Sequence, residues 1–182
     1  LVHAALRQVL GDHVQQKGSM VSDKYLRFDF SHFSKLSEID LENVENFVNK
    51  KIIDHLELEE NRNSSFQDCI DDGVIALFGE KYGDVVRSIK FGESHELFGG
   101  THVKNTSEIR SFIIKSESAI STGIRRIEAI SGDKAVDSLM EQAKTLKEVS
   151  KIVFNDTDPI SALNKLKNPT LSSNTKLEKI HK

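Results

Sequence analysis

Hydrophobic and polar positions in the first third of the chain predict a helix followed by two strands. Apolar residues recur at helical spacing up to Gly11, a natural helix stop, and they are Val2, Ala5, Leu6, Val9 and Leu10. Residues 13–21 and 25–31 are predicted to be strands, because the second segment is rich in aromatic strand formers. The polar stretch 22–24 between them suits a turn.

The middle of the chain continues this mixture of elements. A long amphipathic helix capped near Asp40 is predicted from the spacing of Ile39, Val44, Phe47, Val48, Ile52 and Leu56. Residues 61–65 are polar and are predicted to be a loop, which leads into a short helix over 66–72. Three further strands are expected, over 85–91, 110–118 and 124–130.

The last fifty residues favour helices. From Ser131 onward one face is apolar, formed by Ala135, Leu139, Ala143, Leu146, Val149 and Val153. Pro159 and Pro169 break the pattern, so two or three short helices are expected. The predicted fold class is α+β, a mixed or antiparallel sheet with packed helices followed by a helical C-terminal tail. We expect one domain over 1–132 and the tail over 133–182.

Composition is that of a soluble domain with an extended part. The 182 residues suffice for one substantial domain with an appendage, and the hydrophobic content of 37% is low for a fully compact fold. The one cysteine, Cys69, excludes an internal disulfide and suits the reducing cytoplasm. No apolar run approaches the length of a membrane span, so no membrane partner is expected.

Charge is unevenly distributed along the chain. The net charge is −3, yet residues 161–182 hold five lysines and one glutamate. A protein whose whole surface binds nucleic acid would be basic throughout, so DNA is not an expected partner. RNA, if bound by the main body, would contact a local cluster of basic residues. The lysine-rich end is interpreted as a solvated tail, with phosphate contact as the alternative.

The candidate chemistry lies in the string Glu-Leu-Phe-Gly-Gly-Thr-His over residues 96–102. Two adjacent glycines let the backbone turn tightly and approach a ligand closely, because they lack a Cβ. A hydroxyl and an imidazole follow at once, on Thr101 and His102. On spacing alone, a plain tight turn beside a buried aromatic residue is favoured over a catalytic site.

This string resembles the CGGTH motif of the alanyl-tRNA synthetase editing domain, whose family is shared with threonyl-tRNA synthetases. Phe98 stands where that motif has its cysteine. Further segments resemble the same family in the same order, and they are LVHAALRQVLGDHVQQKGS (1–19), RFDFSHF (27–33), ALFGEKYGD (76–84) and GIRRIEAISG (123–132). ALFGEKYGD points to the synthetase itself, and not to a small stand-alone editing protein.

The resemblance implies a zinc site with four ligands. Two are the cysteine and histidine of the motif, and the other two form an HxxxH pair just before the HAAL segment. This chain begins at Leu1, after that pair, and without an initiator methionine, so we expect it to be a piece of a longer polypeptide. Only His102 remains as a metal ligand here, so we expect zinc in the parent protein and not on this piece alone. Three histidines in the parent are enough for a catalytic zinc.

The resemblance also suggests residues for catalysis and for RNA. Gly99 and Gly100 offer backbone N–H groups to a developing oxyanion, and Thr101 and Gln16 offer polar partners to a serine substrate. Strand-edge polarity explains Gln16 equally well. The expected RNA contacts are Lys17, Lys104, Arg125 and Arg126. The two arginines are neighbours in a strand and point to opposite faces, so one is free for phosphate and the other for a carboxylate such as Glu128.

The activity implied by the resemblance is hydrolysis of serine or glycine wrongly attached to tRNA(Ala), in the cytoplasm. ATP and Mg²⁺ belong to an aminoacylation domain that this sequence does not contain. Two alternatives stay open: a degenerate module that binds tRNA without hydrolysis, and a structural connector whose C-terminal region leads to self-association of the parent protein.

Overall fold

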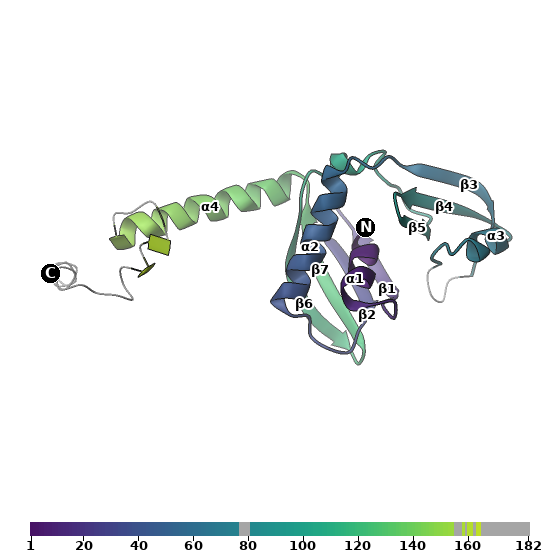
Figure 1. Ribbon diagram of the computed structural model, residues 1–182, viewed down its shortest axis with the longest axis horizontal. Coiled ribbons are helices and arrows are strands. Elements are labelled where there is room, and N and C mark those ends of the chain that lie inside the picture. Colours follow the sequence, from purple (N-terminus) through teal and green to yellow (C-terminus); the bar gives the residue numbers. More distant parts are fainter. Residues whose placement is uncertain (77–80, 155–157, 159, 162, 165–182) are drawn as a thin grey trace. The chain divides into compact units, whose positions relative to one another are not determined.

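The computed structural model describes residues 1–76, 81–154, 158, 160–161 and 163–164. The chain divides into two compact units, Leu1–Val136 and Asp137–Lys182. All strands of the described part lie in the first unit, where they form two separate sheets (Figure 1). The predicted α+β class is confirmed, whereas the division into two sheets was not foreseen.

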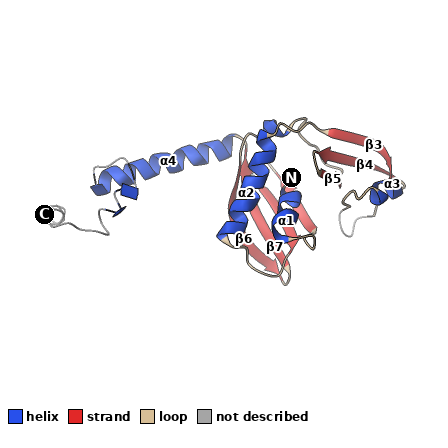
Figure 2. Cartoon of the chain, in the orientation of Figure 1, coloured by secondary structure: helices blue, strands red, loops and turns tan. Residues whose placement is uncertain are grey.

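The larger sheet has four antiparallel strands in the order β1-β2-β7-β6. They are β1 (Gln16–Val21), β2 (Leu26–Ser31), β7 (Ile124–Ser131) and β6 (Phe112–Ser121). Two helices, α1 (Val2–Leu10) and α2 (Glu38–Ile53), lie side by side on one face of this sheet (Figure 2). The helix predicted from apolar spacing up to Gly11 is confirmed, and strands occur within both of the first predicted strand ranges.

The main core lies between these helices and the sheet. Alternation places Phe28 and Phe30 of β2 on the same face as Ile127 and Ala129 of β7. The helices contribute the apolar residues Ala5, Leu6, Val44, Val48 and Ile52. Burying each large apolar side chain contributes about 1.5–3 kcal/mol, so this cluster is the main source of stability of the first unit.

Polar side chains of α2 bind the outer edge of β6. The Asn49 amide donates to the Phe112 carbonyl over 2.8 Å and accepts from the Phe112 N–H over 2.9 Å. One turn earlier, the Glu45 carboxylate accepts from the Ile114 N–H over 2.5 Å. These side chains satisfy backbone groups that have no neighbouring strand on that side.

The start of α2 is fixed by a capping box. Ser37 is the N-cap, and its hydroxyl accepts from the Asp40 N–H while the Asp40 carboxylate accepts from the Ser37 N–H. The pattern of the sequence predicted a cap near Asp40; the structure puts it three residues earlier, because Asp40 acts as the partner within the box.

The smaller sheet consists of β3 (Glu59–Ser65), β4 (Val85–Phe91) and β5 (Ser94–Leu97), all antiparallel. The predicted loop over 61–65 is therefore wrong. β3 contains only polar residues and is exposed along nearly its whole length, so it lacks the apolar alternation that marks a strand, and pairing with β4 holds it. The helix α3 (Phe66–Asp71) packs with this sheet around a small core of Cys69, Val74, Val86 and Leu97.

A short 3₁₀ helix, η1 (Thr106–Ile109), leads from the smaller sheet back to β6. The last described element is the helix α4 (Asp133–Phe154), which confirms a helix after the predicted domain. The predicted short helices around Pro159 and Pro169 lie largely outside the described residues. No helix within the described ranges is long and apolar enough to cross a membrane.

Candidate functional site

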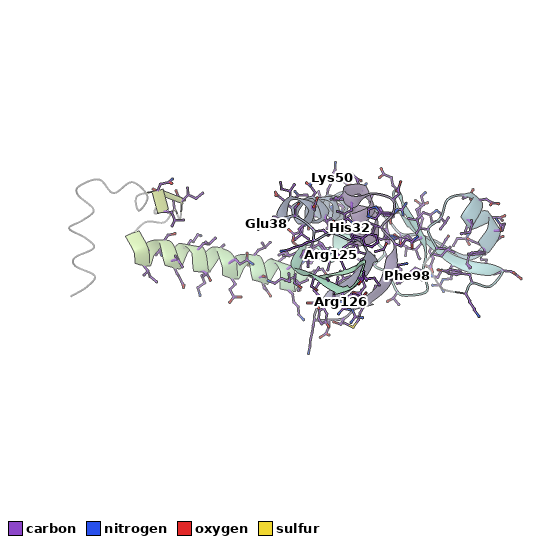
Figure 3. The ribbon with its side chains drawn as sticks, turned by 90° about the horizontal axis from the view of Figure 1, so that it is seen from below. His32, Glu38, Lys50, Phe98, Arg125 and Arg126 are labelled. Carbon is purple, nitrogen blue, oxygen red and sulfur yellow. The ribbon has the colours of Figure 1, made fainter. Side chains whose placement is uncertain are left out.

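The turn over residues 98–102 leaves the smaller sheet at the end of β5. Leu97 is buried in the small core and fixes this end of the strand. The Phe98 N–H still donates to the Arg87 carbonyl over 3.3 Å, after which the chain leaves the sheet. Residues 99–102 are exposed, whereas Phe98, labelled in Figure 3, is half-buried.

Arg87 of β4 fastens this turn. One guanidinium nitrogen donates to the carbonyls of Phe98, over 2.9 Å, and Gly100, over 2.5 Å. The Nε of the same side chain donates to the Glu60 carboxylate over 2.6 Å, so the guanidinium is held from both sides. A planar guanidinium with several fixed donors suits this role, and lysine cannot reproduce it.

The aromatic ring of Phe98 packs within the turn. Its centroid lies 5.1 Å from that of His102, with the rings edge to face. A Cβ atom at Gly100 would lie 2.5 Å from Phe98 Cε1, so only glycine fits under this ring. A Cβ at Gly99, in contrast, would meet no atom within 4 Å. The turn is therefore filled on the Phe98 side and open at Gly99.

His102 is held by its own turn. Its Nδ1 lies 3.2 Å from the Gly100 carbonyl, which is an acceptor, so Nδ1 carries the proton and Nε2 is left with its lone pair. Partial burial of the ring lowers the pKa of His102 below its ordinary value; the hydrogen bond to Gly100 opposes this effect, and the Arg87 guanidinium adds to it. The neutral imidazole is the form this environment favours at neutral pH.

A buried hydrogen bond between His3 and Glu96 joins the first helix to the strand that precedes the turn. His3 Nδ1 lies 3.3 Å from the Glu96 carboxylate, and Ser94 donates to the other Glu96 oxygen over 3.3 Å. Only 4% of His3 is exposed. Burial acts to raise the pKa of Glu96, but the hydrogen bonds from His3 and Ser94 act against it, and this pKa is lowered.

The residues described here do not by themselves fit a metal site. His102 has Phe98, and not a ligand, as a close ring neighbour. No group of three or more His, Cys, Asp or Glu side chains in the described ranges is placed to hold a metal ion. A catalytic zinc needs three protein ligands, so His102 would have to be joined by residues from beyond this set.

The other residues expected at a catalytic site lie in two places. Thr101 is in the turn beside Gly99 and Gly100, and it is exposed. Gln16 is the first residue of β1 in the larger sheet, where its amide donates to the Ser19 hydroxyl over 3.1 Å. The turn therefore brings Thr101 and the two glycines together, while the contact of Gln16 is within its own strand.

The four residues expected to contact RNA differ in how they are held. Lys17 donates to the Gln15 amide over 3.0 Å, and Lys104 is exposed beyond the turn. Arg125 donates to the Glu117 carboxylate, and Arg126 binds Asp29 through two nitrogens over 2.7 and 2.9 Å. The sequence interpretation paired one arginine with Glu128 and left the other for phosphate. In the structure both arginines donate to carboxylates of neighbouring strands, and these are Glu117 and Asp29.

Comparison with known proteins matches this part of the chain to a family. Residues 86–128, from β4 into β7, match the family described as threonyl and alanyl tRNA synthetase second additional domain. The alanine–tRNA ligase of Christiangramia forsetii is 54% identical over 182 residues, which is 100% of this chain and 21% of that protein. The chain belongs to this family.

Two other alanine–tRNA ligases are similar to the chain to a like degree. The alanine–tRNA ligase of Flavobacterium psychrophilum is 48% identical over 100% of this chain and 20% of its own length. That of Thermotoga maritima is 48% identical over 88% of this chain and 19% of its own. The chain spans about a fifth of the length of these curated relatives.

Three residues that organise the site were missed by the sequence interpretation. Arg87 stands among apolar residues of β4, and nothing local indicates that its partners are carbonyls eleven and thirteen residues later. His3 and Glu96 are 93 residues apart, so their pairing requires the tertiary fold. The one available signal was the position of His3 among the apolar residues of an amphipathic helix, where a solvated histidine is out of place.

Proposed function

We propose that this domain is the editing module of an alanine–tRNA ligase, which hydrolyses the ester of serine or glycine wrongly attached to tRNA(Ala), and that Phe98 leaves this activity impaired. The family match and the turn over 98–102 support the assignment of the module. The edge-to-face contact between Phe98 and His102 is the observation that supports impairment. Charging of tRNA with alanine, using ATP and Mg²⁺ in the cytoplasm, is the proposed work of the longer ligase.

The chemistry proposed for this chain's own residues is attack of water on an ester carbonyl. The open space at Gly99 lets the substrate approach the backbone, whose N–H groups suit a developing oxyanion. His102 Nε2 accepts the proton of the attacking water, since Nδ1 is committed to the Gly100 carbonyl. Thr101 in the turn meets the serine hydroxyl, which a pocket must satisfy to accept serine over alanine.

The test is a chimeric ligase. The 182 residues of this chain replace the matched segment of the Christiangramia forsetii ligase, and release of labelled serine from Ser-tRNA(Ala) is followed in the presence and absence of a zinc chelator. We expect slow release with Phe98 and faster release in the Phe98→Cys variant. The unmodified ligase is the reference. Tyr25→Ala is the matched control, because it removes a partly exposed aromatic ring from the connection between β1 and β2.

A second function has one observation in its favour. The ring of Phe98 fills the side of the turn that a ligand would need, which suits a module that binds tRNA without hydrolysis. If the chimera with Phe98 and its Phe98→Cys variant both release serine only at the uncatalysed rate, while each still binds tRNA(Ala), the editing proposal is wrong and the binding module replaces it.

A further inference from the structure

Two histidines stack at the end of the larger sheet, away from the turn over 98–102 in the sequence. His13 lies between α1 and β1, and His32 directly follows β2. Their ring centroids are 5.2 Å apart at an interplanar angle of 30°, and His13 Nε2 lies 2.9 Å from His32 Nδ1. One of these nitrogens carries a proton and donates to the other, so the two rings form one fixed unit.

The backbone around this pair is held firmly. The Ser31 hydroxyl donates to the His13 carbonyl over 3.0 Å and accepts from the Gln15 N–H over 2.9 Å. The His32 N–H donates to the Gly123 carbonyl in the turn between β6 and β7 over 3.0 Å. Both histidines are therefore pre-positioned by hydrogen bonds from three parts of the first unit, which reduces the entropy lost when a ligand binds.

An exposed phenylalanine follows the pair. Phe33 is 85% exposed, and its ring lies close to Gly123, since a Cβ there would lie 3.0 Å from Phe33 Cε1. Gly123 has φ +72°, so glycine is favoured there for its backbone as well as for space. The chain thus presents a large apolar ring to solvent at the position directly after His32.

Among the described residues, a buried carboxylate with an unpaired oxygen, Glu117, acts electrostatically on His32. Arg125 donates to one oxygen of Glu117, whose side chain is 2% exposed. The other oxygen, Oε2, is buried without a hydrogen-bond partner in the part of the chain that the structure describes. Figure 3 labels His32 and Arg125 in the first unit, and Arg125 and Glu117 both act electrostatically on His32.

The charges at this end of the sheet nearly cancel. The groups acting on His32 are His13 from the α1–β1 loop, Arg125 from β7, Glu117 from β6 and Asp40 from α2. Burial, His13 and Arg125 together lower the pKa of His32, which favours neutral rings at neutral pH. Arg125 is already neutralised by Glu117, so attraction of phosphate is weak here, and stacking is the interaction that remains.

We propose that Phe33 and the His13–His32 pair form a stacking platform for an unpaired RNA nucleotide. Single-stranded RNA is recognised by stacking of splayed bases on Phe, Tyr, Trp or His, together with hydrogen bonds to base edges. The choice of RNA rests on the proposed function, whereas the platform itself rests on the geometry of these rings.

The test is fluorescence anisotropy of the full chain with a short labelled RNA that cannot pair, against the same length of duplex RNA. We expect the unpaired RNA to bind more tightly, and Phe33→Ala to weaken its binding about 5-fold to 100-fold, the range for loss of one base stack. Phe33→Trp should retain binding, and His13→Ala should weaken it. Ile53→Ala is the matched control, since Ile53 is also an exposed apolar residue of the first unit.

The platform is overturned if the wild type, Phe33→Ala and His13→Ala proteins bind unpaired RNA with equal affinity. It is also overturned if Ile53→Ala loses as much affinity for unpaired RNA as Phe33→Ala does. Preference for duplex RNA, or no binding of unpaired RNA at all, also overturns it. The deacylation assay separates this inference from the proposed function. Release of serine without a Phe33 effect on RNA binding removes only the platform, and Phe33-dependent binding without release of serine removes only the editing proposal.

Discussion

The ring of Phe98 covers the backbone of Gly100 so closely that the two positions cannot be changed independently. A Cβ at Gly100 would lie 2.5 Å from Cε1 of that ring. The residue in the place of the family's cysteine and the second glycine of the motif are therefore coupled by packing. This coupling is open to measurement.

Gly100→Ala should destabilise the first unit by about 1–3 kcal/mol, the usual cost of overpacking, because the Phe98 ring has to leave its place. The same change in a Phe98→Ala background should cost much less. Thermal unfolding of both singles and the double variant gives the coupling energy. Gly99→Ala is the control, since a Cβ there meets nothing within 4 Å; additive effects of the two changes would contradict this packing.

Arg87→Lys should loosen the turn without unfolding the sheet. Lysine has a single ammonium and cannot reach the Phe98 and Gly100 carbonyls and the Glu60 carboxylate together. Hydrogen exchange of the amides over 98–102 should become faster, while exchange in β2 and β7 stays unchanged. Lys90→Arg, on the same strand, is the control. Unchanged exchange in the turn would show that Arg87 does not hold it.

His3→Ala should destabilise the first unit by about 1–3 kcal/mol, since it leaves one oxygen of the largely buried Glu96 carboxylate without its donor. Chemical denaturation measures this loss. His95→Ala is the control, because it removes a histidine from the same strand as Glu96, β5, while leaving this hydrogen bond intact. A loss as small as that of the control would mean that the hydrogen bond contributes little.

Glu96→Gln should change how stability depends on pH. The pKa of Glu96 is lowered in the folded state from its ordinary 4.5, so its ionised form stabilises the fold above that value. This contribution is lost as the pH falls through the lower, folded-state pKa. The difference in unfolding free energy between wild type and Glu96→Gln should therefore be largest near neutral pH and shrink below about pH 4.5. A difference independent of pH between about 3 and 7 would contradict this assignment.

Asn49→Ala should cost about 1–3 kcal/mol, because it leaves the N–H and carbonyl of Phe112 without partners. Urea unfolding measures the cost. Lys50→Ala changes the neighbouring position of α2 and should lie within about 0.5 kcal/mol of wild type, as surface substitutions usually do. Equal values for the two variants would mean that water replaces the amide at no cost.

Periodicity was enough to find the elements that bury an apolar face. α1 was predicted because its apolar positions fall on one side and Gly11 ends it. β3 was missed for the opposite reason: its seven residues are polar, and only the pairing with β4 defines it as a strand. The periodicity of apolar residues reflects contact with a core, so it does not reveal a strand that is exposed at the edge of a sheet.

The candidate site, too, was predictable from the sequence only in its local part. Two glycines, a hydroxyl and an imidazole within four residues mark the turn in the sequence. What positions that turn is Arg87 from one strand and the His3–Glu96 pair across 93 residues, and such long-range partners cannot be read from local spacing. Of the neighbouring arginines, Arg125 and Arg126, one was expected to contact phosphate and the other a carboxylate. In the structure each donates a hydrogen bond to a carboxylate on an adjacent strand.

The amide of Asn49 and the carboxylate of Glu45 also affect whether this sheet can pair with a strand of a second molecule. By binding the backbone of Phe112 and Ile114, they block the first part of the β6 edge on which a strand from a second molecule would dock. The opposite edge of this sheet, β1, has no such cover from a helix side chain among the contacts of the described residues, and Val21 there is 76% exposed. Of the two edges of the larger sheet, β1 is therefore the one at which we expect a strand of a second molecule to pair if the protein is concentrated or partly unfolded.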